Sequence, residues 1–271
     1  MQSNPMELTK ENYYSREADA EYMSYSQFKQ FTQCEEKALA KIEGRLPKEM
    51  DMPSQSMVQS SYIDAYFSGE LEEFSANHPE MFSSKGATAG QLKAEFKLAD
   101  SVIQSIETDE SYKKLFYSGK TQEIVTGEIA GVLFKGKLDF LYDDYIVDAK
   151  AMASLDPVWD DKSRTKLPFY EFYGYDIQGA IYSELARQKY GREFGYYLAP
   201  VTKEKYPKKE AYRFSKEYLA EALKKVEELA PRYQRIKNHE IEPIGCGVCD
   251  YCRSVYKFNP LDIKEVSEHN G

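Results

Sequence analysis

The spacing of apolar residues along the chain predicts helices that surround a group of strands. Apolar positions that recur every three or four residues indicate helices. Ser24 or Ser26 can cap the first predicted helix, Gly69 lies near the end of the second, and Pro231 is expected to break the last one locally. The five helices are expected over residues 18–43, 56–74, 91–107, 169–190 and 215–237.

Between the third and fourth helices the pattern changes to that of strands. These runs are rich in β-branched and aromatic residues, and Gly or Asp bounds them. They cover residues 123–128, 130–142 and 145–150, with a further strand at 194–201. The first three should form a meander. The order helix, sheet, helix, strand, helix predicts a single α/β domain over residues 1–271, with a central mixed β-sheet flanked by helices.

Composition indicates a globular protein and limits its partners. Apolar residues make up 42% and aromatic residues 14% of the 271 residues, which is enough for a core. No run approaches the roughly 20 apolar residues that a membrane span needs, so we expect a cytoplasmic protein without a membrane partner. The net charge of -9 argues against a protein that coats nucleic acid through a broad basic surface. It is compatible with an enzyme that clusters carboxylates around metal ions.

The segment 136–150 carries the strongest candidate chemistry. Asp143 and Asp144 supply a tight turn, so the strands on either side should pair as a hairpin and bring Asp139 near Asp148. The two-residue period of a strand places Asp148 and Lys150 on the same face. Two carboxylates and an ammonium are therefore expected on one face of the sheet.

Such a group is suited to phosphodiester hydrolysis. The carboxylates can hold one or two divalent cations, which polarise the scissile phosphate and lower the pKa of a bound water. Lys150 can orient that water or stabilise developing negative charge. Oxygen ligands of this kind suit Mg²⁺ or Mn²⁺. The alternative is that Asp139 and Asp148 are exposed strand ends, although charges within otherwise apolar strands are costly without compensation.

The pattern Gly-x-Leu-Asp, then Ile-Val-Asp-Ala-Lys, then Gln178-x-x-x-Tyr182 on the following helix resembles motifs of the RecB-type branch of the PD-(D/E)xK nucleases. The resemblance implies a restriction-endonuclease-like core. It implies that Asp139 and Asp148 are metal ligands and that Lys150 is the catalytic lysine. It also implies that Gln178 and Tyr182, one helical turn apart, border the active site and contact the DNA backbone.

One part of the pattern departs from this family. Many RecB-type nucleases carry a metal-binding histidine on an upstream helix, and residues 61–67 resemble that helix with Asp64 at the histidine position. Asp64 is therefore a candidate metal ligand, and the alternative is a surface residue of an amphipathic helix. His78 precedes Pro79 in a polar loop and is expected to be exposed. Glu128 is a further candidate acidic neighbour.

Four cysteines form a second candidate site. Cys246, Cys249 and Cys252 are separated by two residues each, and Cys34 lies far away in the first predicted helix. In a reducing compartment such spacing points to a metal rather than to disulfides. Zinc and a 4Fe-4S cluster can both take four cysteine ligands, and four unrelated thiols are the remaining alternative.

This arrangement, with one cysteine before the core and three after it, resembles the iron–sulfur staple of AddB-like nucleases. This resemblance favours a structural 4Fe-4S cluster, with structural Zn²⁺ as the alternative. The cluster would join the N-terminal helix, residues 18–43, to the Cys-rich segment of about residues 240–256.

Two groups of basic residues are candidates for contact with DNA phosphates, and the alternative for each is a solvated loop. They are Lys203, Lys205, Lys208 and Lys209, with Tyr206 among them, and Lys162, Arg164 and Lys166.

Within the PD-(D/E)xK nucleases the sequence most resembles phage-encoded exonucleases of the RecE or exodeoxyribonuclease VIII type. The resemblance implies a magnesium-dependent DNA exonuclease that resects linear duplex ends in phage or prophage recombination, with a recombinase as a candidate partner. The alternative is a non-catalytic DNA-binding or scaffold module stabilised by a metal cluster. The sequence does not predict the oligomeric state.

Overall fold

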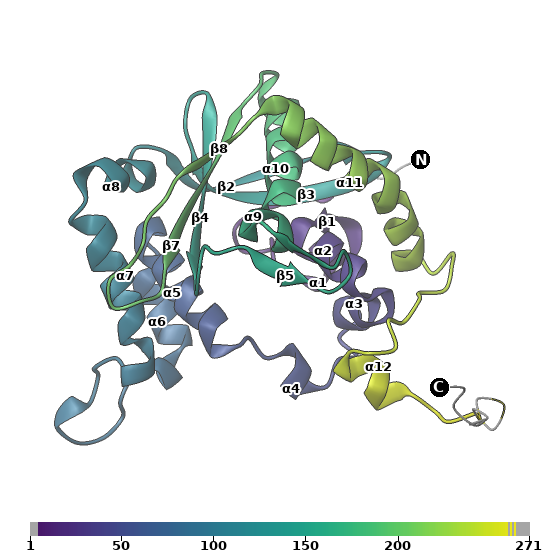
Figure 1. Ribbon diagram of the computed structural model, residues 1–271, viewed down its shortest axis with the longest axis horizontal. Helices are drawn as coiled ribbons and strands as arrows, with labels where there is room; N and C mark the ends of the chain where they lie inside the picture. Colours follow the sequence, from purple (N-terminus) through teal and green to yellow (C-terminus); the bar gives the residue numbers. More distant parts are fainter. Residues whose placement is uncertain (1–4, 260, 262, 264–271) are drawn as a thin grey trace, which may run out of the picture.

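A central mixed sheet with helices on both faces forms the core of the computed structural model (Figure 1). This architecture confirms the predicted α/β class. The structure describes residues 5–259, 261 and 263. The domain predicted over residues 1–271 therefore includes ends, residues 1–4 and 264–271, that lie outside the described residues.

The strands pair in the order β1-β3-β4-β7-β8, and β2 lies alongside β3. The pairs β1–β3 and β4–β7 are parallel, whereas β2–β3, β3–β4 and β7–β8 are antiparallel. The strands β5 and β6 form a separate hairpin. The bounds are β1 Met23–Ser24, β2 Lys120–Ile129, β3 Val132–Leu141, β4 Tyr145–Met152, β5 Val158–Asp160, β6 Thr165–Leu167, β7 Gly195–Thr202 and β8 Tyr212–Phe214.

Helices gather in two groups, one on each face of the sheet (Figure 1). The helices α2, α10 and α11 pack on one face, and α5, α7 and α8 pack on the other. The helices are α1 Arg16–Glu21, α2 Tyr25–Gln33, α3 Glu35–Ile42, α4 Lys48–Asp51, α5 Gln55–Ser68, α6 Leu71–Asn77, α7 Lys97–Glu107, α8 Glu110–Tyr117, α9 Phe169–Phe172, α10 Tyr175–Tyr190, α11 Lys216–Lys237 and α12 Asp250–Val255. Short 3₁₀ turns lie at Pro79–Met81, Gly86–Thr88 and Ala94–Phe96.

The strands β3, β4 and β7 contribute side chains to both cores, because successive residues of a strand point to opposite faces. On β4, Ile146 belongs to the core under α10, whereas Val147 belongs to the core under α5 and α7. Asp148 follows Ile146 by two residues and therefore lies on the α10 face of the sheet. Within the described residues, no helix is long and apolar enough to cross a membrane.

The single helix predicted over residues 18–43 is wrong, because the chain is extended at two points within it. Met23–Ser24 pairs with β3, and the Ser24 hydroxyl then caps α2 by accepting from the Gln27 N–H at 3.2 Å. Cys34 is also extended, with φ of -163° and ψ of 110°, and separates α2 from α3. Sheet pairing and capping thus override the helical spacing.

Two helices in the C-terminal half of the chain also differ from their predictions. The helix predicted over residues 169–190 is divided at Gly174, whose φ of 75° ends the short α9 and starts α10. Pro231 does not break α11, which runs unbroken through it. A proline removes one helical hydrogen bond, and burial of Ala230 and Tyr233 in the core holds this part of the helix in place.

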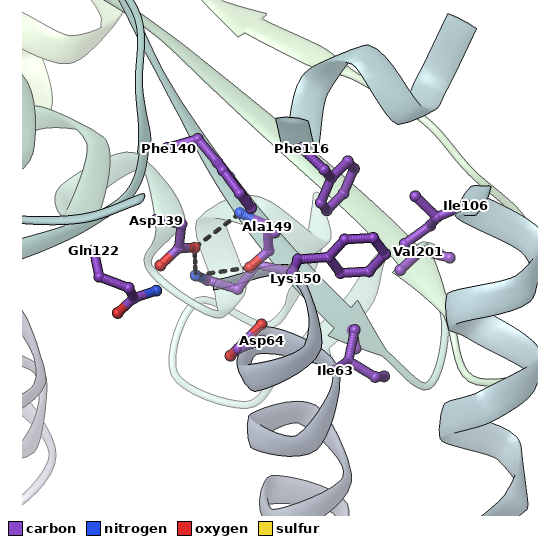
Figure 2. Close-up of a pocket in the computed structure, with 12 residues that line it drawn as sticks. Ile63, Asp64, Ile106, Phe116, Gln122, Asp139, Phe140, Ala149, Lys150 and Val201 are labelled. Carbon is purple, nitrogen blue, oxygen red and sulfur yellow. Dashed lines mark hydrogen bonds and ion pairs between the residues drawn. The ribbon is translucent and has the colours of Figure 1, made fainter. Parts of the chain in front are cut away.

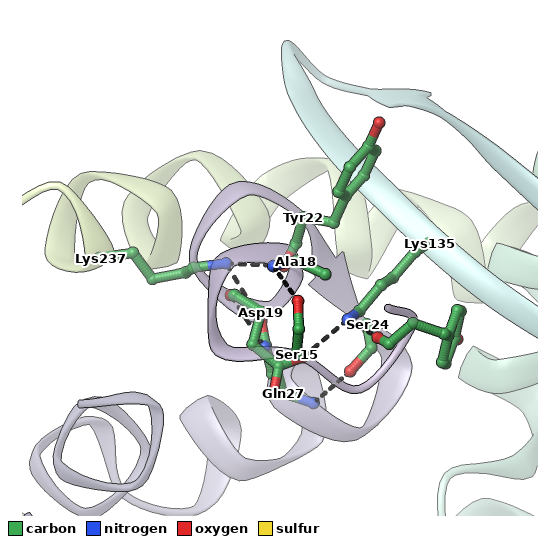
Figure 3. A network of polar contacts seen from close by, with 9 residues as sticks. Ser15, Ala18, Asp19, Tyr22, Ser24, Gln27, Lys135 and Lys237 are labelled. Atoms are coloured by element: carbon green, nitrogen blue, oxygen red, sulfur yellow. Dashed lines mark hydrogen bonds and ion pairs between the residues drawn. The ribbon is translucent and has the colours of Figure 1, made fainter. Parts of the chain in front are cut away.

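A buried lysine fixes the N-terminal segment to the sheet (Figure 3). Lys135 of β3 is only 1% exposed, and its ammonium donates to the Tyr13 carbonyl at 2.5 Å and to Asp19 at 2.8 Å. Lys237 of α11 donates to the Tyr22 carbonyl at 2.8 Å, and burial lowers its pKa to about 7. Two lysines from different elements therefore hold the segment that contains α1 and β1.

Replacing Lys135 with methionine should lower the free energy of unfolding by about 2 kcal/mol, because the Tyr13 carbonyl would lose its partner while Asp19 could turn to water. Urea unfolding followed by circular dichroism measures this. The control is Lys120→Met, an exposed lysine on β2, which should change stability by less than about 0.5 kcal/mol. Equal stability of the two variants would contradict this role for Lys135.

Candidate active site

The strand β4 places Asp148 and Lys150 on the face of the sheet that α10 covers. The Asp148 side chain is fully buried. Its Oδ1 accepts from the Gln178 amide at 2.9 Å, and its Oδ2 forms an ion pair with the Lys150 ammonium. The predicted same-face placement of Asp148 and Lys150 is therefore present in the structure.

Asp139 lies where β3 and β4 separate. The paired register of these strands includes Leu141 with Ile146 and Phe140 with Val147. Asp139 precedes Phe140 on β3, and its Oδ2 accepts from the backbone N–H of Ala149 on β4 at 3.0 Å. The carboxylate thus bridges the two strands, and its Oδ2 lies 3.9 Å from the Lys150 Nζ.

Three oxygens surround the Lys150 ammonium, and Figure 2 shows those of Asp139 and Ala149. They are the Asp148 Oδ2, the Asp139 Oδ2 at 3.9 Å and the Ala149 carbonyl oxygen at 3.2 Å. The ring of Tyr175 lies on the same ammonium, with its centroid 5.5 Å away. This set of two carboxylates and one carbonyl oxygen already holds one positive charge and is chemically suited to a hard cation.

Burial and mutual repulsion shift the pKa of the charged groups. Burial, with a smaller effect from the Asp139 carboxylate, raises the pKa of Asp148 to about 7 against the opposing effect of Lys150. Burial alone would lower the pKa of Lys150. The Asp148 and Asp139 carboxylates outweigh that effect and raise it well above its ordinary value, so the ammonium stays charged.

Asp64 of α5 faces the same group across a pocket (Figure 2). The pocket has a polar side with Asp64, Asp139 and Lys150, and an apolar side that includes Phe116 and Phe140. Desolvation by the surrounding residues and the nearby Asp139 charge together raise the pKa of the Asp64 carboxyl to about 8. Asp64 is nevertheless one of the exposed residues of α5.

The helix α5 is attached to β4 next to this pocket, since the Ser60 hydroxyl donates to the Ala151 carbonyl at 3.1 Å. Among the described residues, the only set of three or more acidic, histidine or cysteine side chains close enough to share a metal is the cysteine group. Asp64 therefore faces Asp139 and Asp148 without completing a three-carboxylate site. Its role as a metal ligand stays a prediction.

The other acidic and histidine candidates lie elsewhere. His78 pairs with Glu80 at 2.8 Å and stacks on Phe74 with ring centroids 4.2 Å apart. Glu128 pairs with Leu133 near the hairpin turn of β2 and β3, whereas Asp139 lies near the opposite end of β3. Glu128 is therefore not an acidic neighbour of the site.

The helix α10 approaches the site closely because glycines lie at its contacts. A Cβ at Gly179 would lie 2.5 Å from the Tyr196 ring, and a Cβ at Gly136 would lie 3.0 Å from the Tyr182 ring. Gln178 and Tyr182 are both buried as a result. Gln178 holds Asp148, and the pKa of Tyr182 is raised by burial and then by Asp148 and Asp139. Their contact with the DNA backbone stays a prediction.

Several groups of the site have no signal in the sequence that would predict them. The Ala149 carbonyl has no side-chain signal, and Tyr175 is one of many tyrosines. Gln122 lies opposite Asp139 at a gap in the β2–β3 pairing and has a φ of 55°, which residues other than glycine seldom adopt. Such strain is often found beside functional groups, and Gln122 lines the same pocket.

The two basic groups have different surroundings. Lys203 donates to the Ser56 carbonyl at 2.8 Å, and Lys209 pairs with Asp109 at 2.9 Å. These lysines therefore attach the β7–β8 connection to neighbouring helices. The second group is exposed on the β5–β6 hairpin, between β4 and α9, and consists of Lys162, Arg164 and Lys166.

The four cysteines converge, as the sequence predicted. Their sulfur atoms all lie within 4.8 Å of one another, and the Cys34 Sγ is 3.4 Å from that of Cys252. The group joins the start of α3 to the segment around α12, at the edge of the molecule (Figure 1). These residues could together bind a metal.

Comparison with known proteins supports the assignment of the fold. A family model described as "PDDEXK-like domain of unknown function (DUF3799)" matches residues 24–255. The crystal structure of a protein described as a "putative exonuclease" from Eubacterium rectale is similar, with a TM-score of 0.87 and 40% sequence identity over 97% of both chains. No curated protein matches the sequence. Because the family model covers most of the chain, the protein belongs to the PDDEXK-like family DUF3799.

Proposed function

We propose that this protein is a metal-dependent deoxyribonuclease that degrades linear DNA from its ends. The observation that carries the proposal is the convergence of Asp139, Asp148 and Lys150 at the separation of β3 and β4. Membership of a PDDEXK-like family and the similarity to a protein described as an exonuclease support it.

The residues present fit a divalent cation. Asp139, Asp148 and the Ala149 carbonyl would hold it, because their oxygens already surround a positive charge. When bound, Mg²⁺ or Mn²⁺ would polarise the scissile phosphate and lower the pKa of a water molecule. Asp64 is the further candidate ligand, from the opposite wall of the pocket.

The chain's own residues have separate tasks in this proposal. Lys150 keeps its proton, so its ammonium stabilises the negative charge that develops on the phosphate or orients the attacking water. Gln178 fixes the orientation of the buried Asp148 carboxylate through its amide. Tyr182 borders the same carboxylates and limits the access of bulk water.

The proposed substrate is duplex DNA with a free end. The exposed cations of the β5–β6 hairpin, Lys162, Arg164 and Lys166, are well placed for phosphate contacts because the hairpin directly follows β4. Resection of ends in phage or prophage recombination, with a recombinase as partner, is the biological role that we propose for this activity.

End-labelled linear duplex and covalently closed circular DNA of the same sequence test the proposal. With Mg²⁺, the linear substrate should be degraded at least about 100-fold faster than the circle, because only the linear DNA offers an end. An excess of EDTA should abolish degradation, and added Mn²⁺ should restore it. Circular DNA cut as fast as linear DNA would contradict the exonuclease assignment, and cleavage in EDTA would contradict the metal requirement.

A further inference from the structure

The spacing of the four cysteine sulfurs indicates what they bind. The Sγ of Cys34 lies 3.4 Å from that of Cys252 and 3.9 Å from that of Cys249. The Sγ atoms of Cys246 and Cys252 are 4.0 Å apart, and the whole group of four lies within 4.8 Å. Each of these distances is close to the separation of two sulfur atoms that bind the same metal ion.

The two candidate metal groups require different spacings. Two sulfurs on one tetrahedral zinc ion are about 3.8 Å apart, because each zinc–sulfur bond is about 2.3 Å long. In a 4Fe-4S cluster each cysteine binds a different iron atom, which places the sulfurs about 6 Å apart. Four sulfurs within 4.8 Å leave no room for an inorganic cube between them. The cysteines therefore do not fit the iron–sulfur cluster that the resemblance to AddB-like nucleases implies.

We infer that Cys34, Cys246, Cys249 and Cys252 bind a single tetrahedral ion, Zn²⁺, in a closed site with a structural role. Four thiolates fill a tetrahedral coordination shell and leave no open position for water or substrate. Such a site stabilises the fold and takes no part in hydrolysis.

The backbone around the cysteines supports a preformed site. The N–H of Cys249 points to the Sγ of Cys246 at 3.3 Å, and the N–H of Cys252 points to the Sγ of Cys249 at 3.5 Å. The N–H of Cys246 reaches the Sγ of Cys34 at 3.5 Å across the two segments.

Contacts around the cysteines show what the ion would stabilise. Glu35, next to Cys34, pairs with Arg232 of α11 at 2.7 Å and accepts from the Ile244 N–H at 2.7 Å. A Cβ at Gly245 would lie 2.4 Å from the Glu36 carboxylate and 3.2 Å from the Cys252 Sγ, so the chain passes close to α3 and to the cysteines there. The ion would thus join the end of α2 to the C-terminal segment and close a loop of more than two hundred residues.

Metal content of the wild-type chain tests this inference. The protein is produced with iron and zinc both in excess and purified without oxygen or chelator. Plasma mass spectrometry should then find one zinc per chain, with no acid-labile sulfide and no brown colour. Replacement of zinc by Co²⁺ should give the intense visible absorption of a tetrahedral tetrathiolate site. Iron and sulfide at about four atoms each per chain, or a chain without bound metal, would overturn it.

A matched pair of variants separates the site from its surroundings. Cys246→Ser should lower the zinc content about tenfold and lower the melting temperature, since one ligand is lost. Val248→Ser changes an exposed side chain in the same loop and should keep the full zinc content. Equal zinc content in the two variants would overturn the assignment of Cys246 as a ligand.

Discussion

Replacing Asp148 with asparagine should slow the cleavage of linear duplex DNA by about 10³-fold, at an unchanged Mg²⁺ concentration. The amide has nearly the same shape as the carboxylate but carries no charge, so it cannot hold a divalent cation beside Asp139. It also pairs poorly with the Lys150 ammonium, which contacts Asp148 directly. Initial rates on end-labelled DNA, with excess enzyme, measure the effect.

The matched control for this variant is Asp144→Asn. Asp144 lies in the exposed turn between β3 and β4, so the same chemical change occurs four residues away on the same hairpin. This variant should keep the wild-type rate. Thermal unfolding of both variants confirms that they are folded. An Asp148→Asn enzyme that cleaves as fast as Asp144→Asn would place the activity in another site or in a contaminant.

Replacing Lys150 with methionine should also reduce cleavage by about 10³-fold, but for a different reason. Methionine keeps the length of the side chain and removes the charge that stabilises the phosphate or orients the water. The carboxylates of Asp139 and Asp148 remain, and they lose the ammonium that competes for their oxygens. We therefore expect Lys150→Met to bind Mn²⁺ at least as tightly as the wild type.

Calorimetric titration with Mn²⁺ distinguishes the two variants. Lys150→Met should bind Mn²⁺ but cleave about 10³-fold more slowly than the wild type, whereas Asp148→Asn should be as slow and should not bind Mn²⁺. Lys120→Met, on the exposed part of β2, is the control for a lost lysine charge. A Lys150→Met protein that keeps the wild-type cleavage rate would show that the lysine has no role in the reaction.

The part of the site that depends on local chain geometry could be predicted from the sequence. A tight turn at Asp143 and Asp144 and the period of two along β4 suffice to bring Asp139, Asp148 and Lys150 together. The pattern of apolar segments likewise predicted the mixed sheet and its flanking helices.

Features that depend on long-range packing could not be predicted. The position of Asp64 opposite Asp139 requires α5 to pack beside β4, and no local pattern encodes that contact. The burial of Lys135 follows from pairing of β3 with β1, which divides the first predicted helix. The cysteine spacing indicated a metal, but only the distances between sulfurs separate a single ion from a cluster.

The most direct test of the proposed active site is a crystal of the wild-type protein soaked in Mn²⁺, with diffraction recorded at a wavelength where manganese scatters anomalously. We expect an anomalous peak bonded to the carboxylates of Asp139 and Asp148 and to the Ala149 carbonyl, with the Lys150 ammonium moved aside. Manganese bound elsewhere, with Lys150 still between the two carboxylates, would contradict it.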